Sequence, residues 1–207
     1  MKRLSVIYLF VIAATASAQD GWISLFNGKD LTDWKIGGDP STFQIKDGAM
    51  FTKGPVAHAF YDGPVNVHDF KNFELMVDVM AAQNSNGGIY FHTEFQPGAF
   101  PRKGFEVQVN NTYNTDPIKT GSLYHVQDVG TSDIKDNQWY TTHILVQDNT
   151  VTVNINGKQV VKWTQTPDWN GGREGPGRVI GRGTIALQGH DPNSTVYYKN
   201  IRIKPLP

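Results

Sequence analysis

The chain has 207 residues, in which 19 lysines and arginines balance 19 aspartates and glutamates, and it contains no cysteine. The lack of cysteine excludes disulfides, zinc–thiolate sites and a thiol nucleophile. The balanced charge, without a basic stripe, argues against nucleic acid as a partner. Twenty-one glycines, eleven prolines and 12% aromatic residues favour an all-β fold with many turns.

The N-terminus has the pattern of a secretory signal peptide. A basic Met-Lys-Arg start precedes an apolar run over residues 4–14, and Ala-Ser-Ala at residues 16–18 offers a cleavage site. The apolar run is short for a bilayer span, and no later segment resembles one. We therefore expect residues 1–18 to be removed and the protein to be exported, either to the periplasm or as a secreted protein. Residues 19–207 are expected to form one domain.

The first strands are expected around turn signals. Asp47-Gly48 separates two extended runs and predicts a hairpin over residues 43–51, because a type I′ turn needs positive φ at both central positions. Residues 52–70 contain Gly-Pro pairs without periodicity, which indicates a loop with at most a short edge strand. Residues 72–80 alternate apolar and polar side chains and give the clearest strand of the chain.

Two further alternating segments follow, at residues 87–94 and 105–110. Successive side chains of a strand point to opposite faces, so each segment has one apolar face and one polar face. The polar faces carry Tyr90, His92 and Glu94 in the first segment, and Glu106 and Gln108 in the second. If the two strands pair, His92 and Glu106 share one surface.

The rest of the chain continues the β pattern. No segment resembles an amphipathic helix of three turns, and turn signals recur at intervals of roughly ten residues, which is typical of an antiparallel sandwich. We predict an all-β, two-sheet antiparallel sandwich of the jelly-roll kind. A Gly/Pro-rich loop is expected at residues 166–183, and extended segments at 121–126, 139–146, 150–155, 158–163, 184–190 and 195–204.

Several segments, in order, resemble the 3-keto-disaccharide hydrolase domain family and together cover nearly the whole chain after residue 18. Two departures stand out: a small insertion in Asn84-Ser85-Asn86-Gly87-Gly88, and His92 where arginine is often expected. The matching segments are Leu25–Trp34, Asn72–Leu75, Asn86–Phe91, Gly104–Val109, Gly121–Tyr124, Asn154–Lys158, Ile185–His190 and Tyr198–Ile203.

This resemblance implies a concanavalin-like jelly roll and an exported carbohydrate-active enzyme. Its substrates would be glycosides already oxidised at sugar carbon 3. The resemblance also implies cleavage of these 3-keto-glycosides, by hydrolysis or by 1,2-elimination followed by hydration.

Glu106 is the leading catalytic candidate. Ordinary glycoside cleavage needs two carboxyl groups, but the neighbour of Glu106 on its strand face is Gln108, which cannot titrate. A 3-keto substrate relaxes this requirement, because the ketone acidifies the hydrogen on carbon 2 and one base can start elimination. A glutamate on a strand face is, however, more often simply solvated.

Three histidines are candidates to assist Glu106. His92 lies on the same predicted face, whereas His125 and His190 follow strand-like segments, where binding loops gather. His92, Glu106 and His125 could also bind a divalent metal ion through nitrogen and oxygen atoms. The sequence has no local ligand motif, so a metal cofactor stays an open possibility.

Other side chains are candidates for binding a small-molecule sugar. The aromatic faces of Tyr90, Tyr124 and Trp169 could pack against sugar rings, and Gln108 and Gln188 could hydrogen-bond hydroxyl groups. Arg173 or Arg178 could contact a polar ligand from the Gly/Pro-rich loop.

Two alternatives remain open at this point. One is a non-catalytic carbohydrate-binding module with the same fold, and the other is a conventional glycoside hydrolase. A deep pocket that joins Glu106 to histidines would favour an enzyme, whereas a shallow aromatic groove would favour the binding module.

Overall fold

The computed structural model describes residues 19–207, and the signal peptide expected at residues 1–18 lies outside the described residues. Four short 3₁₀ turns accompany thirteen strands: η1 (Gln19–Gly21), η2 (Pro40–Thr42), η3 (Val65–His68) and η4 (Gly172–Glu174). The strands are β1 (Ile23–Ser24), β2 (Trp34–Gly38), β3 (Phe43–Lys46), β4 (Ala49–Thr52), β5 (Ala57–Tyr61), β6 (Asn72–Ala81), β7 (Gly87–Thr93), β8 (Phe105–Val109), β9 (Tyr140–Gln147), β10 (Thr150–Ile155), β11 (Lys158–Thr164), β12 (Thr184–Gly189) and β13 (Val196–Leu206).

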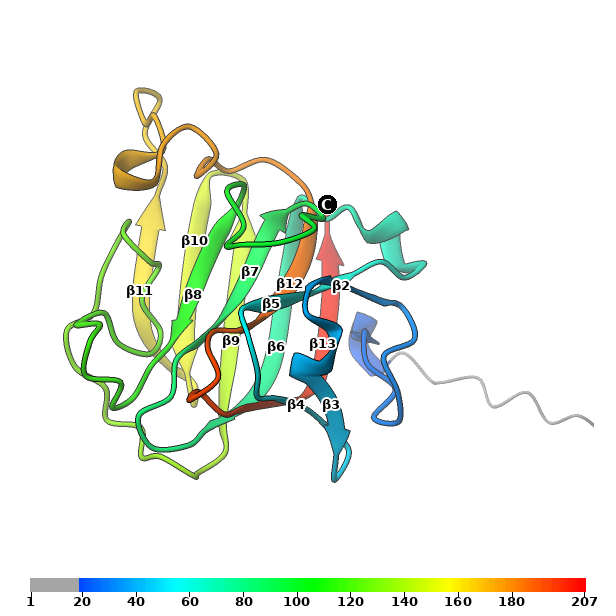
Figure 1. Cartoon of the computed structure of the whole chain (residues 1–207). Coiled ribbons are helices and arrows are strands. Elements are labelled where there is room, and N and C mark those ends of the chain that lie inside the picture. The colour runs from blue at the N-terminus through cyan, green and yellow to red at the C-terminus, as the bar shows by residue number, and fades with distance from the viewer. Residues whose placement is uncertain (1–18) are drawn as a thin grey trace, which may run out of the picture.

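The strands form two antiparallel sheets that pack face to face (Figure 1). One sheet has the order β11-β10-β9-β6-β13-β4-β3, with β1 added beside β13, and the other has the order β2-β5-β12-β7-β8. The predicted all-β jelly-roll sandwich is therefore confirmed. Among residues 19–207, no helix is long and apolar enough to cross a bilayer.

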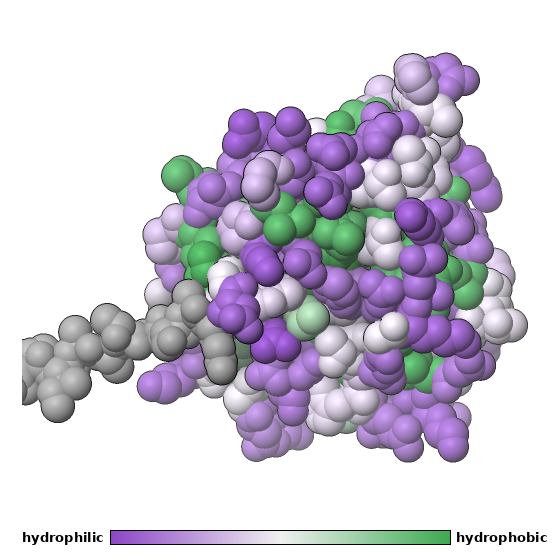
Figure 2. Space-filling view, turned by 180° about the vertical axis from the view of Figure 1, so that it is seen from behind, coloured by the Kyte–Doolittle hydropathy of each residue, from purple (hydrophilic) through white to green (hydrophobic). Residues whose placement is uncertain are grey.

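The hydrophobic core fills the space between the sheets. Alternation in β6 sends Phe73, Leu75, Val77 and Val79 inward, and all four are fully buried. The residues between them, Glu74 among them, are partly exposed on the opposite face, as expected for an antiparallel sheet with one solvated side. Figure 2 shows that the side of the molecule hidden in Figure 1 is largely hydrophilic with scattered apolar patches.

Most predicted strands are present, including the hairpin over residues 43–51 and the pairing of β7 with β8. The expectation of a loop at residues 52–70 is wrong in part, because β5 is an internal strand between β2 and β12. Residues 121–126 form no named strand, but they run beside β8 through hydrogen bonds such as Tyr124 N to Glu106 O at 2.9 Å.

Four strands of the five-stranded sheet are buried on both faces, and only the edge strand β2 has exposed residues. Strands β5, β7, β8 and β12 consist of buried residues throughout. The core covers one face, and loops cover the other. The loop over residues 94–104 lies directly on β2, because the amide of Gly38 donates to Pro97 O at 2.8 Å. A Cβ atom on Gly37 would stand only 2.0 Å from Gln96 O. Glycine at this position is therefore what lets the loop approach.

We expect Gly37→Ala to destabilise the protein by about 1–3 kcal/mol, because the added methyl group must displace the covering loop. Urea unfolding measures the change. Gly98→Ala is the matched control, since a Cβ atom at Gly98 in the same loop meets no heavy atom within 4 Å. Equal stabilities for the two variants would contradict the packing described.

Candidate active site

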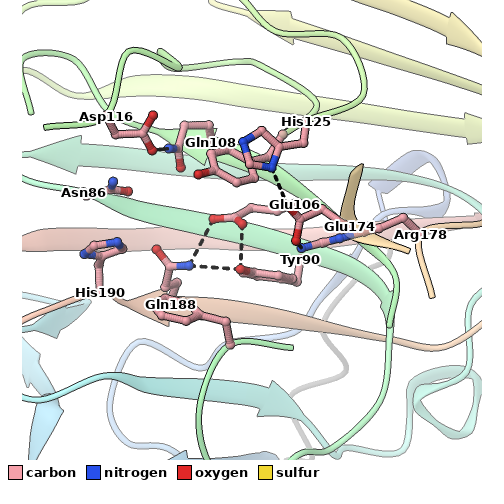
Figure 3. A pocket seen from close by; sticks show the side chains of 12 residues that line it. Asn86, Tyr90, Glu106, Gln108, Asp116, His125, Glu174, Arg178, Gln188 and His190 are labelled. Carbon is pink, nitrogen blue, oxygen red and sulfur yellow. Dashed lines mark hydrogen bonds and ion pairs between the residues drawn. The ribbon is translucent and has the colours of Figure 1, made fainter. Parts of the chain in front are cut away.

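A pocket of about 280 Å³ lies on the loop-covered face of the five-stranded sheet (Figure 3). Strands β7, β8 and β12 form its floor, and the segments that connect the strands form its walls. Its lining contains three carboxyl groups, two histidines, one arginine and several amides and aromatic rings: Asn86, Tyr90, Phe100, Glu106, Gln108, Asp116, Tyr124, His125, Glu174, Arg178, Gln188 and His190.

Glu106 occupies the floor of the pocket and is only 6% exposed. Tyr90 is its direct partner across the β7–β8 pair, and the tyrosine hydroxyl donates to Glu106 Oε2 at 2.6 Å. Gln188 Nε2 on β12 donates to Glu106 Oε1 at 3.0 Å. A Cβ atom on Gly88 would lie 2.3 Å from Glu106 Oε1, so glycine provides the space for this carboxyl group.

Burial raises the pKa of Glu106 to about 7, although hydrogen bonds from Tyr90 and Gln188 and the charge of Arg178 act in the opposite direction. Desolvation dominates, because the carboxylate loses more hydration free energy on burial than its interactions with these three partners restore. A carboxyl group with a pKa near neutrality can accept or release a proton at physiological pH. Glu106 therefore has the properties of a general acid or base.

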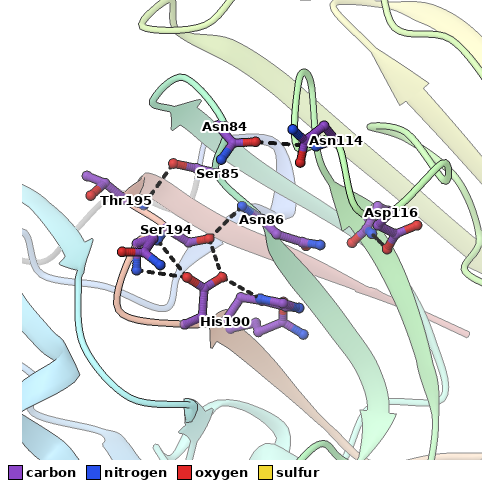
Figure 4. A network of polar contacts seen from close by, with 12 residues as sticks. Asn84, Ser85, Asn86, Asn114, Asp116, His190, Ser194 and Thr195 are labelled. Carbon is purple, nitrogen blue, oxygen red and sulfur yellow. Dashed lines mark hydrogen bonds and ion pairs between the residues drawn. The ribbon is translucent and has the colours of Figure 1, made fainter.

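Two histidines in the pocket wall are each braced by a carboxylate. His125 Nδ1 contacts Glu174, which also lies 3.9 Å from Arg178 Nη2. His190 Nδ1 contacts Asp191 Oδ2 at 2.8 Å, and Ser194 Oγ donates to the same oxygen at 2.7 Å (Figure 4). A carboxylate at Nδ1 fixes the orientation of an imidazole ring and leaves Nε2 for other partners.

Several buried polar atoms of the pocket have no hydrogen-bond partner among residues 19–207. They belong to side chains that are at most 4% exposed. Buried polar atoms are normally paired. The unpaired atoms of this pocket could therefore form hydrogen bonds with a ligand that carries many hydroxyl groups. The atoms are Asn86 Oδ1, Gln108 Oε1, Arg178 Nε and Gln188 Oε1.

His92 does not lie beside Glu106, so the prediction that the two share a surface is wrong. His92 has a φ of 53°, and pairing of β7 with β8 ends at Phe91 opposite Phe105. Its ring is buried against Phe73 and Phe91, and Nε2 contacts Lys71 O at 2.8 Å. Burial lowers its pKa to about 4. His92 is therefore a neutral residue that packs outside the pocket.

Trp169 also lies outside the pocket, contrary to its predicted role as a sugar platform. Its Nε1 donates to Arg178 O at 2.7 Å, and its ring packs edge-on against Trp163. Trp169 thus anchors the loop that supplies Glu174 and Arg178. The ring of Tyr90 is buried, so only its hydroxyl group faces Glu106.

The remaining predicted residues lie at or beside the pocket. Gln108, Tyr124, His125, Gln188 and His190 line it, and Arg173 lines an adjoining hollow. The ring of Tyr124 packs against that of His125 at a centroid distance of 4.1 Å. Gln108 Nε2 donates to Asp116 Oδ2 at 3.0 Å.

The metal site considered for His92, Glu106 and His125 is not assembled, because His92 is elsewhere. Across residues 19–207, no group of three or more histidine, cysteine, aspartate and glutamate side chains is arranged to hold a metal ion.

Five residues at the site were not among the sequence candidates. Asn86, Phe100, Asp116 and Glu174 line the pocket, and His58 is buried behind it, 5.3 Å from the ring of Tyr90. Asp116 lies in an irregular loop and Glu174 at the end of the short turn η4, where no periodicity indicates the direction of a side chain. Asn86 stands in a segment that matches the family, which was the one available signal.

The architecture is that of jelly-roll proteins, several of which handle carbohydrates. A carbohydrate-binding module of family 66 from Bacillus subtilis shares the fold with a TM-score of 0.61 and 11% identity, over 83% of this chain and 95% of that one. At this identity the likeness concerns the fold alone.

The chain belongs to the family described as the 3-keto-alpha-glucoside-1,2-lyase-like domain, which matches residues 21–204. A 3-keto-disaccharide hydrolase from Bacteroides thetaiotaomicron is 23% identical, over 90% of this chain and 79% of that protein. The crystal structure of a candidate glycosyl hydrolase from Parabacteroides distasonis has a TM-score of 0.76 and 27% identity, over 90% and 94% of the two chains. At the level of its family, the protein is therefore glycosyl hydrolase-like.

The burial of Glu106 predicts a pH-dependent cost in stability. Its pKa is about 7 in the folded state against a usual 4.5, so between these values the folded protein keeps a proton that the unfolded chain releases. Raising the pH from 5 to 8 should therefore destabilise the wild type relative to Glu106→Gln, by on the order of 2–3 kcal/mol. Urea unfolding of both proteins at the two pH values measures the difference. A difference that stays constant with pH would contradict the raised pKa.

Proposed function

We propose that this protein is an exported enzyme that cleaves the glycosidic bond of 3-keto-glycosides. Cleavage would proceed by removal of the carbon-2 proton, elimination of the group at carbon 1 and addition of water. The observation that carries the proposal is the buried Glu106 carboxyl group, with a pKa of about 7, in a pocket of uncommitted polar atoms. Export rests on the signal-peptide pattern of residues 1–18.

The first step uses Glu106 as a base. Its carboxylate takes the hydrogen from carbon 2, and the electron pair of that C–H bond forms an enolate with the carbon-3 ketone. The enolate then expels the oxygen at carbon 1, which leaves a double bond between carbons 1 and 2. Water that adds across this double bond returns a free 3-keto sugar, so the net change equals hydrolysis.

Arg178 is the group best suited to stabilise the enolate. Its side chain is 4% exposed, Nη1 donates to Gly104 O at 3.0 Å, and Nε has no partner within the described chain. A fixed cation in a water-poor pocket stabilises developing negative charge without reorganisation. Its attraction also lowers the pKa of Glu106, which helps the base form to exist at neutral pH.

His125 is the proposed acid for the leaving oxygen. Glu174 occupies Nδ1, so Nε2 is the nitrogen that can exchange a proton with the ligand. His125 lines the Glu106 pocket, and its ring packs against that of Tyr124, which fixes its position in the wall. His190 instead packs against Phe100 and Tyr113, which suits a wall residue.

A conventional glycoside hydrolase would need a second carboxyl group to work with Glu106. Asp116 and Glu174 line the pocket, but both are engaged by other groups. Asp116 accepts hydrogen bonds from Gln108 Nε2 and from the Ile118 amide. Glu174 contacts His125 and Arg178. These contacts favour the keto-sugar mechanism, in which one base is sufficient.

The direct test is incubation with a 3-keto-glycoside and with its unoxidised parent, with and without a chelator, followed by product analysis. We expect cleavage of the keto substrate alone. Cleavage of the parent alone would contradict the proposal and support a conventional hydrolase. Binding without cleavage of either compound would support a carbohydrate-binding module.

Glu106→Gln should lower kcat/KM on a 3-keto-glycoside by about 10²–10⁴-fold, because glutamine cannot accept the proton. In the wild type, kcat/KM should rise with pH through about 7, as the carboxyl group that must act as a base becomes ionised. Steady-state rates between pH 5 and 9 measure both effects. Full activity of Glu106→Gln would exclude this residue as the base.

His125→Ala should impair substrates with poor leaving groups most strongly. We expect a loss of about 10²-fold or more with an alkyl 3-keto-glycoside, but a smaller loss with a nitrophenyl 3-keto-glycoside, whose leaving oxygen needs no protonation. Comparison of kcat for the two substrates measures this difference. His143→Ala is the control, because His143 contacts Glu74 on the eight-stranded sheet, away from the pocket. Equal losses on both substrates would contradict the acid role of His125.

A further inference from the structure

A second hollow, of about 510 Å³, adjoins the Glu106 pocket and shares part of its wall. We propose that this hollow is a leaving-group subsite that binds a second sugar ring, an inference that rests on the proposed function. Tyr113 and Arg173 are among the residues that line the hollow but not the Glu106 pocket. The residues that line both spaces include Asn86, Asp116, Tyr124 and His190.

The sizes of the two spaces support this division. Small-molecule pockets usually measure about 300–1,000 Å³, and the Glu106 pocket, at about 280 Å³, falls just below that range. It therefore suits a single ring, and a ligand the size of a disaccharide must extend into the adjoining hollow. Because Glu106 is at the floor of the first pocket, the reacting ring belongs there and the departing group belongs in the hollow.

Asn86 marks the boundary between the two spaces. Its side chain is 2% exposed, and its Oδ1 has no hydrogen-bond partner within residues 19–207. Its backbone N–H donates to Ser194 Oγ at 2.9 Å, and the same hydroxyl binds Asp191, the residue that braces His190 (Figure 4). A buried side-chain amide on an anchored backbone, with an oxygen that still has bonding capacity, can bind a ligand that passes from one space to the other.

Tyr113 and Arg173 give the hollow the chemistry of a sugar site. The ring of Tyr113 packs edge-on against His190, with 5.5 Å between centroids, and its amide donates to Asn110 Oδ1 at 2.9 Å. Arg173 is exposed and forms no ion pair within the described residues, so its donors can reach ligand oxygens. One fixed aromatic ring and one free cluster of donors suit a neutral ring with hydroxyl groups.

The experiment compares a 3-keto-disaccharide with the methyl 3-keto-glycoside of the same reacting ring. Tyr113→Ala and Arg173→Ala should each lower kcat/KM for the disaccharide about tenfold more than for the methyl glycoside, because only the disaccharide fills the hollow. Asn114→Ala is the control. Asn114 is exposed beside Tyr113 but lines neither space, and this variant should leave the ratio unchanged. Equal losses on both substrates would overturn the subsite.

A binding measurement separates failure of the subsite from failure of the proposed function. In a Glu106→Gln background, calorimetric titration should show tighter binding of the disaccharide than of the methyl glycoside, and addition of Tyr113→Ala should remove most of that difference. This outcome would support the subsite even if the wild type cleaves neither compound, a result that would reject only the proposed reaction. Equal affinities of the two ligands before Tyr113 is changed would overturn the subsite itself.

Discussion

The chemistry proposed for this protein depends on one carboxyl group that is held out of water. Glu106 is buried between Tyr90 and Gln188, and desolvation dominates its pKa even though three neighbours favour the charged form. A carboxylate left without partners in such a place would cost several kcal/mol. The two hydrogen bonds reduce this cost without removing it, so the carboxyl group retains a strong affinity for a proton.

The covering loops create the environment in which that affinity is useful. A five-stranded sheet with one open face would leave Glu106 solvated, and its pKa would then be ordinary. Instead, Gly37 lets the loop over residues 94–104 lie on β2, and a Cβ atom on Gly177 would stand 2.1 Å from Arg102 O. The loop over residues 166–183, which contains Gly177, therefore packs against the loop over residues 94–104. This contact and the hydrogen bond of Trp169 to Arg178 O place Arg178 and Glu174 over the pocket.

The sequence predicted the strands better than it predicted the site. Alternation located β6, β7 and β8 and singled out Glu106, because a period of two assigns each side chain to a face. It missed β5, because His58 and Phe60 share one face of that strand and the segment therefore shows no alternation of polar and apolar residues. It misplaced His92, because the positive φ of this residue ends the alternation of side-chain directions after Phe91. Loop carboxylates such as Asp116 and Glu174 carry no periodic signal, and only the folded chain places them.

The identity of residue 108 decides how the pocket can react. An acid at position 108 would be the next side chain after Glu106 on the same strand face. Two like charges so close together would raise the pKa of at least one of them further. Glutamine avoids this repulsion, and its amide holds Asp116 by a hydrogen bond of 3.0 Å. The carboxylate of Asp116 is thereby fixed in the pocket wall and is not free to act as a second catalytic carboxylate with Glu106. One titrating group on the floor suits a substrate that is activated by its own ketone.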